Sequence, residues 1–475
     1  MSGTTPAPAG GPAPASGEPS ATAPALAARV RRGYALGGVA TGSFGTVPGL
    51  MLLPYLTERL GVPAALAGAI VFAPKAWDVV LNPVAGRISD HSRHPDGPRR
   101  PFLLRAGLTL AVAFALLFAG PASPQAVAAG WVAVLFLACA TAYAFFQVPY
   151  VAMPAELTDD PRERTRIMSW RVAVLALAIL VSGGLAPMVR NVVGPERGYA
   201  AMGLFVAVLI AVGALGAWWG TRGAPVRAVA AAEGGLRSQL TLVAGNRDFR
   251  ALIVTFVVQA LATGAMLAGV DYVARQVLRD PAAGSLLFVC FVAPAIVCTP
   301  LWDRLAAATG KKRGYAVSSL VLAAGALALL GARVMPAALV YLAVAVVGVG
   351  YAGAQMLPLS MLPDVAAADT AVSGENRVGV FTGVWTAGET LGMALGPFVF
   401  GLVLAAGGYR SSTDSTVVQP DSAVTAIVWG FSVLPAALTL ASLLALRGYR
   451  LVLDPVATPD RDASARAQGG DPDRP

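Results

Sequence analysis

The sequence predicts an all-α integral membrane protein with twelve transmembrane helices in two pseudosymmetric six-helix bundles. The chain has 475 residues, of which 56% are hydrophobic and 13% charged, and its mean hydropathy is +0.65. These values are typical of membrane proteins. Twelve apolar runs are long enough to cross a bilayer, since about 20 helical residues span its hydrocarbon core. Short motifs also recur at equivalent places in the two sets of six runs, which indicates an internal duplication.

The apolar runs form two groups of six around a polar interval. They lie at approximately 36–56, 64–86, 102–121, 129–153, 168–189, 199–219, 250–274, 282–302, 314–334, 336–361, 379–406 and 424–446. We therefore expect a disordered tail (1–28), an N-terminal six-helix bundle (29–220), a cytoplasmic linker (221–248), a C-terminal six-helix bundle (249–450) and a second disordered tail (451–475). Within the linker we expect a short surface helix around Leu236–Val243.

The distribution of basic residues predicts the orientation in the membrane. An even number of spans places both termini on the same side. With cytoplasmic termini, 27 Lys and Arg residues face the cytoplasm, 7 face outside, and Lys75 lies within the membrane. This asymmetry follows the positive-inside rule and predicts a multi-pass protein of the inner or plasma membrane. Topology thus explains the net charge of +9, and we expect no nucleic-acid partner.

The second run carries ionisable residues at membrane depth. Lys75, Asp78 and Asn82 are spaced i, i+3 and i+7, so they share one helix face. A charged side chain at the centre of a membrane helix costs about 2.5–3.5 kcal/mol on insertion scales and is functional by default. Such a face must line a cavity or meet other polar side chains, as the path of a transporter does.

Motifs at the ends of the runs repeat between the halves. The second run is followed by GRISD at 86–90 and GPRR at 97–100, and the eighth by WDR at 302–304 and GKKR at 310–313. The fourth and tenth runs both end in P-x4-P followed by an acid, Glu156 or Asp364. Repeated bundles are the signature of transporters whose substrate site lies between them.

With these motifs the chain resembles the major facilitator superfamily, and within it the glycoside–pentoside–hexuronide:cation symporter branch, which includes melibiose permeases and lysolipid carriers. The matching stretches are KAWDVVLNPVAGR at 75–87, VPYVAMPAELTDDPRERT at 148–165, SMLPDV at 360–365 and GENRVGVFTGVWTAGETLGMALG at 374–396. The resemblance implies secondary active transport by alternating access, with sugar or glycoside symport as the family expectation. It also implies a small-molecule substrate, contact with membrane lipid and a monomeric state.

The resemblance also suggests residue roles. Asp78 takes the place of a cation-binding acid, with Lys75 one turn before it, and Arg171 that of a substrate-contacting arginine. Elsewhere the chain departs from the family: Gly42 replaces a sugar-binding acid, Asn82 and Gln147 replace cation-site acids, Glu389 replaces a lysine, and Val151 and Gln355 replace aromatic residues that flank the sugar. These departures disfavour a galactoside substrate and a sodium site like that of melibiose permeases.

The candidate cation ligands are therefore Asp78, Asn82 and Gln147, and few hard oxygens remain for Na⁺, which favours H⁺ coupling through Asp78. Alternatively, Lys75 and Asp78 form a structural ion pair. The candidate substrate residues are Lys75, Arg171, Gln355, Trp385 and Glu389. Trp385 and Glu389 lie i, i+4 on one helix face. We expect Glu389 to pair with Lys75 or Arg171, whereas ordinary packing is the leading alternative for Trp385.

Further charged residues are candidates for gating. Asp271 and Arg275 lie i, i+4 near the outer end of the seventh helix, where they form either an extracellular gate or an interfacial snorkelling pair. On the cytoplasmic side we expect salt bridges between the bundles that hold the outward-open state, although topology alone explains several of these arginines. The residues concerned are Asp90, Arg99, Arg100, Glu156, Arg164, Asp303, Arg304 and Asp364, with Arg162, Lys311 and Arg377 in the same motifs.

Other function classes find little support in the sequence. It contains no Walker A, HExxH or GxSxG motif, so we expect no enzyme activity. We expect no metal, since His91 and His94 read as solvated loop residues, and no cofactor beyond a coupling H⁺ or Na⁺. Two alternatives stay open: an efflux carrier for lysolipids or drug-like molecules, and a channel or receptor without coupled transport.

Overall fold

The computed structural model describes residues 27–92, 94–95, 97–158, 160–224, 245–373, 378–414 and 417–451. Regular structure in these ranges is entirely helical. Eleven helical segments of the described residues are long and apolar enough to cross a membrane, with α15 and α16 counted together as one (Asp421–Leu446), or twelve if the bent pair α10 and α11 also counts as one span. The predicted all-helical membrane fold is confirmed. The predicted helix at Leu236–Val243 and most of both tails lie outside the described residues.

The first half of the molecule, residues 27–224, is called the N half below. Its helices are α1 (Ala28–Pro54), α2 (Ala64–Asp90), α3 (Arg100–Leu117), α4 (Gln125–Ala152), the short α5 (Pro154–Leu157), α6 (Pro161–Val193) and α7 (Gly198–Thr221). A π-helical turn, Tyr55–Arg59, continues α1. The helices begin and end within a few residues of the apolar runs, except that α1 and α6 begin earlier, at Ala28 and Pro161, in the polar residues before their runs.

The second half, residues 245–451, is the C half. Its helices are α9 (Arg247–Tyr272), α10 (Ala283–Val297), α11 (Thr299–Thr309), α12 (Lys311–Ala328), α13 (Ala337–Ser373), α14 (Val378–Ala406), α15 (Asp421–Phe431) and α16 (Val433–Leu446). A π-helical turn, Val273–Val277, continues α9. The first long helix of each half thus ends in the same unusual turn, and such turns are frequent at functional sites.

One predicted helix is broken. The sequence predicts a single span at 282–302, but the structure bends by 49° between α10 and α11. Pro294 lies inside α10, and Pro300 occupies the first turn of α11. Proline removes a backbone donor and clashes with the preceding turn, so a helix kinks or restarts there.

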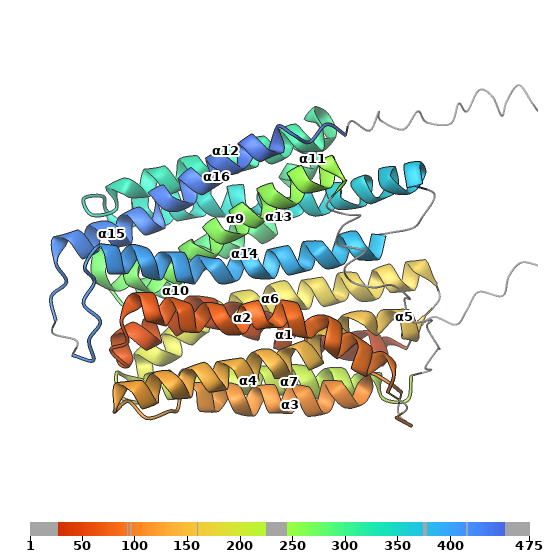
Figure 1. Cartoon of the computed structure of the whole chain (residues 1–475), viewed down its shortest axis with the longest axis horizontal. Coiled ribbons are helices and arrows are strands. Elements are labelled where there is room, and N and C mark those ends of the chain that lie inside the picture. The colour runs from red at the N-terminus through yellow and green to blue at the C-terminus, as the bar shows by residue number, and fades with distance from the viewer. Residues whose placement is uncertain are drawn as a thin grey trace, which may run out of the picture.

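Each half is a packed group of helices, and the two groups lie side by side (Figure 1). Within the N half, α1 packs against α6 and α7, and α4 packs against α2 and α3. Within the C half, α9 packs against α14 and α16, and α13 packs against α10 and α12. The halves are joined mainly by α2 with α14, α6 with α10 and α1 with α9, and α1 also touches α14.

The molecule has two distinct ends along its long axis (Figure 1). Residues 27 and 451 lie at one end, called the terminal end, and the turns after α1 and α9 lie at the other, called the distal end. Near the distal end α2 and α14 touch backbone to backbone. A Cβ on Gly401 would lie 2.6 Å from the Ala64 carbonyl oxygen, and one on Gly68 would lie 3.0 Å from Phe398 Cα. Small residues permit this approach of two membrane helices.

Candidate functional site

The predicted ion pair of α2 lies in the middle of that helix. Asp78 is 3% exposed, and its Oδ2 lies 3.9 Å from Lys75 Nζ. The Lys75 ammonium also lies 4.3 Å from the ring centre of Phe44 and 5.4 Å from that of Tyr143. Asp78 Oδ1 has no hydrogen-bond partner within the described part of the chain. The pair is therefore loose, with one carboxylate oxygen unused.

Tyr143 of α4 connects this pair to the other predicted residues. It lies within electrostatic range of Asp78, of Arg171 on α6 and of Glu389 on α14. The Arg171 guanidinium carbon lies 5.2 Å from the ring centre of Tyr150, in cation–π geometry. Its Nε is buried with no hydrogen-bond partner among the described residues. Charged groups of both halves thus lie around one partly buried tyrosine, as a site between two bundles requires.

The expected pairing of Glu389 is not formed. No ion pair joins Glu389 to any described residue, and Lys75 turns instead to Asp78 and to aromatic rings. Glu389 is half-buried and lies within electrostatic range of Tyr143 of the N half. A membrane carboxyl without an ion pair among the described residues is available to a polar group of a solute.

The three candidate cation ligands do not close around one point. Gln147 Oε1 accepts a hydrogen bond of 2.7 Å from Thr41 of α1. No hydrogen bond joins Asn82 or Gln147 to Asp78 in the described ranges. Asp78 is the only acid of the three, which is consistent with a site for a proton.

Two candidate substrate residues have other contacts. The Trp385 side chain is 1% exposed and stacks on Phe256, with ring centres 4.2 Å apart. This agrees with the packing alternative, and contact of Trp385 with substrate stays a prediction. Gln355 donates a hydrogen bond of 2.8 Å to the Tyr351 hydroxyl, and Tyr351 stacks on Phe291. Gln355 is partly exposed and stays a candidate.

Asp271 belongs to a set of polar contacts between the halves at the distal end, and this set is called the distal gate below. The Arg190 guanidinium of α6 donates two hydrogen bonds to its carboxylate, at 2.7 and 3.0 Å. Arg275 Nε lies 3.0 Å from Asp271 Oδ2 and 3.4 Å from Glu58 Oε2. Since Arg190 and Glu58 come from the N half and Asp271 and Arg275 from the C half, the gate interpretation is favoured over a snorkelling pair.

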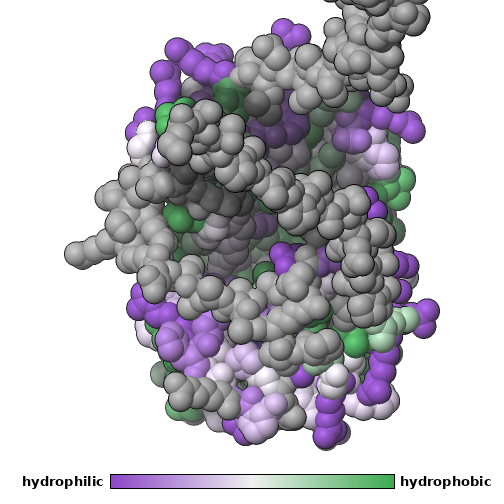
Figure 2. Space-filling view, turned by 90° about the vertical axis from the view of Figure 1, so that its right-hand side faces the viewer, coloured by the Kyte–Doolittle hydropathy of each residue, from purple (hydrophilic) through white to green (hydrophobic). Residues whose placement is uncertain are grey.

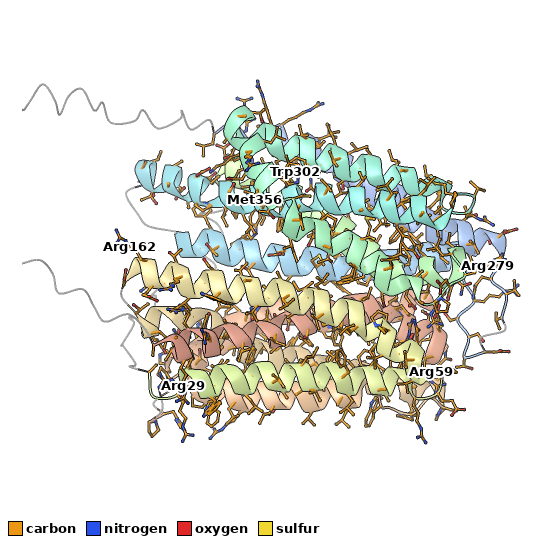
Figure 3. The ribbon with its side chains drawn as sticks, turned by 180° about the vertical axis from the view of Figure 1, so that it is seen from behind. Arg29, Arg59, Arg162, Arg279, Trp302 and Met356 are labelled. Atoms are coloured by element: carbon orange, nitrogen blue, oxygen red, sulfur yellow. The ribbon has the colours of Figure 1, made fainter. Side chains whose placement is uncertain are left out.

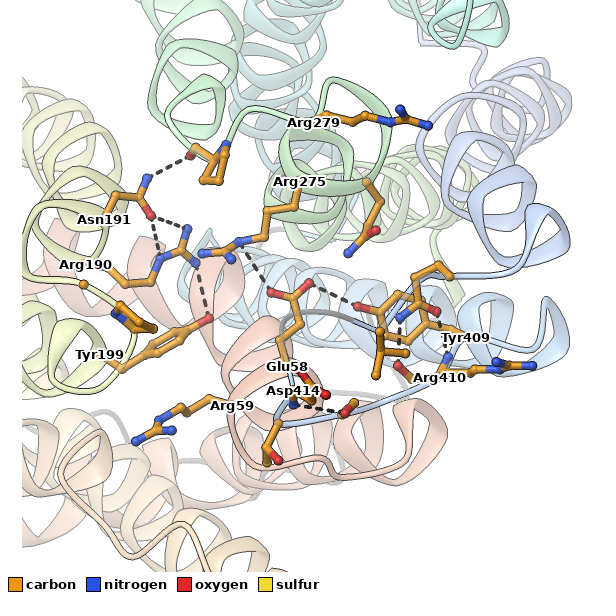
Figure 4. A pocket seen from close by; sticks show the side chains of 18 residues that line it. Glu58, Arg59, Arg190, Asn191, Tyr199, Arg275, Arg279, Tyr409, Arg410 and Asp414 are labelled. Carbon is orange, nitrogen blue, oxygen red and sulfur yellow. Dashed lines mark hydrogen bonds and ion pairs between the residues drawn. The ribbon is translucent and has the colours of Figure 1, made fainter.

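Neutral side chains extend this gate (Figure 4). Tyr199 accepts a hydrogen bond of 3.2 Å from Arg190. Tyr409 of the C half donates one of 3.1 Å to Glu58 of the N half. Thr57 and Tyr272 share a buried hydrogen bond of 2.6 Å across the same interface. The distal end of the molecule is therefore closed by polar contacts between the halves.

Sequence reasoning missed Arg190 and Glu58. Both lie in the last turn of a long helix, where charged residues are common in membrane proteins, so their positions did not mark them as functional. The available signal was Asp271, since a carboxylate so close to the membrane interior needs a partner. The sequence could not say which of the outer arginines supplies it.

At the terminal end, the predicted gating residues pair within their own halves. Arg99 contacts Asp90 at 2.8 Å and Glu156 at 3.2 Å, and Lys311 contacts Asp364 at 2.5 Å. A base from the loop thus meets the acid after P-x4-P in both halves, as the repeat suggests. The expected salt bridges between the bundles are absent from the described part of this conformation.

Two further terminal-end candidates form hydrogen bonds within the N half. Arg100 donates a hydrogen bond of 2.5 Å to the Ala224 carbonyl oxygen, and Arg164 one of 3.0 Å to that of Thr158. Asp303 and Arg304 are exposed, and Arg377 lies outside the described residues. Figure 2 shows this end hollowed between the halves. The conformation is closed at the distal end and open at the terminal end.

Labelled arginines mark the two ends of the molecule in Figure 3. Arg59 and Arg279 lie at the distal end, and Arg29 and Arg162 lie at the terminal end.

Residues 33–452 match the family model described as MFS/sugar transport protein. The chain belongs to this family.

Individual relatives agree with the family. The chain is 26% identical to the "Uncharacterized symporter sll1374" of Synechocystis, with 83% of this chain and 88% of that protein covered. It is also 26% identical to the "Glucuronide carrier protein homolog" of Escherichia coli, with 78% and 82% covered. The crystal structure of a D-xylose-proton symporter shares the fold, with a TM-score of 0.63, 13% identity, and 89% of this chain and 99% of that chain covered.

These comparisons confirm the resemblance to the sugar and glycoside symporter branch of the major facilitator superfamily. As a member of this family, the chain is a multi-pass membrane transporter, which confirms the prediction of transport rather than enzymatic catalysis.

Proposed function

We propose that this protein is a secondary active transporter that moves a small anionic or strongly polar organic solute by alternating access, coupled to a proton on Asp78. One observation carries the proposal: Asp78 is buried in the middle of α2, with a lysine at 3.9 Å and one carboxylate oxygen that has no hydrogen-bond partner among the described residues. A carboxyl group in this setting can alternate between a protonated neutral form and a carboxylate paired with Lys75. That alternation links proton binding to the charge of the cavity.

Among the charges around Tyr143, Lys75 pairs with Asp78, which leaves Arg171 as the partner for an acidic group of the solute. The N half contributes Lys75 and Arg171, whereas the C half contributes Glu389. An acidic group of the solute would meet Arg171, and hydroxyl groups would meet Glu389 and Gln355. The relative named as a glucuronide carrier protein homolog supports a sugar that bears a carboxylate.

The orientation proposed here has both termini in the cytoplasm. The excess of 27 over 7 basic residues on the side of the termini supports it. The distal end then faces outside, and the conformation described above is open toward the cytoplasm. We further propose that residues 29–220 and 249–450 rock against each other as two bundles about the central site.

Proton-coupled solute uptake in proteoliposomes tests the proposal. Sugars, glycosides, uronates and lysolipids are screened for solute-driven alkalinisation of the external buffer, with Na⁺ replaced by choline to separate the two coupling ions. We expect Asp78→Asn to lose proton-coupled accumulation and to retain exchange of solute across the membrane. Asp421→Asn, which changes an exposed acid in the C half, is the matched control and should behave as wild type.

Two results would contradict the proposal. If Asp78→Asn moves protons with solute as wild type does, the Lys75–Asp78 pair is structural. If lysolipids alone are transported, the efflux alternative is correct and the sugar interpretation is wrong.

A further inference from the structure

The distal gate forms one wall of a polar cavity of about 540 Å³. Figure 4 shows it from close by, with Arg190, Arg275 and Glu58 together at its centre. Small-molecule sites in proteins occupy about 300–1,000 Å³, so the cavity has room for a solute. The central site around Tyr143 is separate from it, since no residue of that cluster lines the cavity.

Arginines are concentrated in this cavity. Only seven Lys and Arg residues lie on the distal side of the predicted spans, and the following five of them line it: Arg59, Arg190, Arg275, Arg279 and Arg410. The other two, Arg197 and Arg333, do not. The positive-inside rule depletes this side of basic residues, so topology does not explain why those that remain share one cavity.

The acids of the cavity do not balance these arginines. Glu58 and Asp414 line the cavity. Asp271 does not line it but contacts Arg190 and Arg275, which do. Five guanidinium groups thus meet three carboxylates, which leaves an excess of two positive charges. A concave surface of one sign raises the local concentration of opposite charges.

The excess charge is located at the rim of the cavity. Arg59 donates its hydrogen bond of 3.2 Å to the Glu196 carbonyl oxygen, which carries no formal charge. The guanidinium groups of Arg279 and Arg410 meet no carboxylate within the described ranges, and both residues are exposed. These three are called the rim arginines. The gate arginines differ from them because Asp271 and Glu58 already satisfy their charge.

We propose that this cavity is a second, anion-binding site, in which the rim arginines hold the carboxylate, sulfonate or phosphate group of a small organic solute above the closed gate. Guanidinium groups recognise such oxyanions by paired hydrogen bonds. Asn191, Gln276 and Gln419 also line the cavity and offer amide groups to the hydroxyls of a sugar acid. The binding of an anion at this site does not depend on the membrane orientation proposed above.

Binding at this site is linked to the conformation of the gate. Arg59 belongs to the N half, whereas Arg279 and Arg410 belong to the C half. The complete rim therefore exists only while the distal ends of the two halves are in contact. A ligand that binds one conformation better shifts the population toward it, so an anion in the cavity stabilises the distally closed state.

Calorimetric titration of the full-length protein in nanodiscs of neutral lipid tests the site. The Arg171→Gln variant serves as parent, because it lacks the anion partner proposed for the central site. The probes are D-glucuronate, inorganic sulfate and, as the uncharged control, D-glucose. We expect glucuronate and sulfate to bind the parent with an affinity that falls as NaCl is added, and glucose to give no comparable signal.

The rim is then removed in the same parent by Arg59→Gln, Arg279→Gln and Arg410→Gln together. We expect about a tenfold rise in the Kd of glucuronate, equivalent to about 1.4 kcal/mol. The matched control is Arg197→Gln with Arg333→Gln, which removes the two distal-side arginines outside the cavity and should leave the Kd unchanged. Restoring the three charges as lysines should recover part of the affinity.

Three results would overturn the proposal: no anion binding to the parent, an unchanged Kd without the rim arginines, or an equal loss in the control pair. Failure of the transport proposal is recognised separately, because it concerns proton coupling through Asp78, which none of these variants changes.

Discussion

The ion pair between Arg190 and Asp271 is the strongest single contact of the distal gate, and its loss should open the gate. The two side chains are 3% and 2% exposed and their closest atoms lie 2.7 Å apart. Asp271→Asn keeps the shape of the side chain but removes its charge. The Arg190 guanidinium then stays buried with only Tyr199 and Asn191 as close neutral partners.

The cost of this change follows from burial. Removing one partner of a buried ion pair costs about 3–5 kcal/mol, because the other charge is left without compensation. In a distally open conformation both side chains regain water, so the cost falls on the closed conformation alone. Since 1.4 kcal/mol is a factor of ten, the ratio of closed to open molecules should fall roughly a hundred- to several-thousand-fold.

Pulsed EPR distances across the distal end measure this ratio. Spin labels are placed at Glu196→Cys in the N half and Val418→Cys in the C half, both at exposed positions, after the native cysteines are replaced. We expect a single short distance in the parent and a longer, dominant one with Asp271→Asn.

A second ion pair provides the control. Arg333 and Asp421 also lie 2.7 Å apart, within the C half, but their side chains are 42% and 92% exposed. Exposed pairs contribute about 0–1 kcal/mol, so Asp421→Asn should leave the distance unchanged. If Asp271→Asn also leaves it unchanged, the buried pair does not hold the halves together and the gate assignment fails.

Two further predictions concern packing and pH. Gly401→Ala should lengthen the same distal distance, because its Cβ would lie 2.6 Å from the Ala64 carbonyl oxygen. Overpacking of this kind costs about 1–3 kcal/mol. The control is Gly383→Ala on the same helix, where a Cβ meets nothing within 4 Å. Burial raises the pKa of the Glu156 carboxyl although Arg99 opposes the shift. The folded protein thus holds this proton to higher pH than the unfolded chain, and thermal stability should fall as pH rises above about 4.3. Glu156→Gln should flatten that fall, and an unchanged slope in thermal-shift measurements would exclude Glu156 as its source.

The fold was predictable from the sequence because run length and charge asymmetry act locally. Each helix needs only about 20 apolar residues, and this condition was visible for every span. The break between α10 and α11 was not predicted, since prolines are tolerated inside other helices such as α4 and α14. Proline content alone therefore did not distinguish a bend from a continuous span.

The central residues were also predictable, but their partners were not. Asp78, Arg171 and Glu389 stand out because charges are expensive in apolar helices. Which charges pair depends on how the two halves are placed, and a sequence does not specify one state of an alternating carrier. Lys75 accordingly turns to Asp78 and Phe44 rather than to Glu389.

The two ends of the molecule use ion pairs in different ways, and this difference bears on how the halves alternate. At the distal end, Arg190 and Asp271 join opposite halves and must separate when that end opens. At the terminal end, Arg99 with Glu156 and Lys311 with Asp364 stay within one half each, so they can persist in both conformations and rigidify the halves. Asp303 and Arg304 are exposed in this conformation. They are therefore the terminal-end residues that we expect to form new contacts between the halves when the distal gate opens.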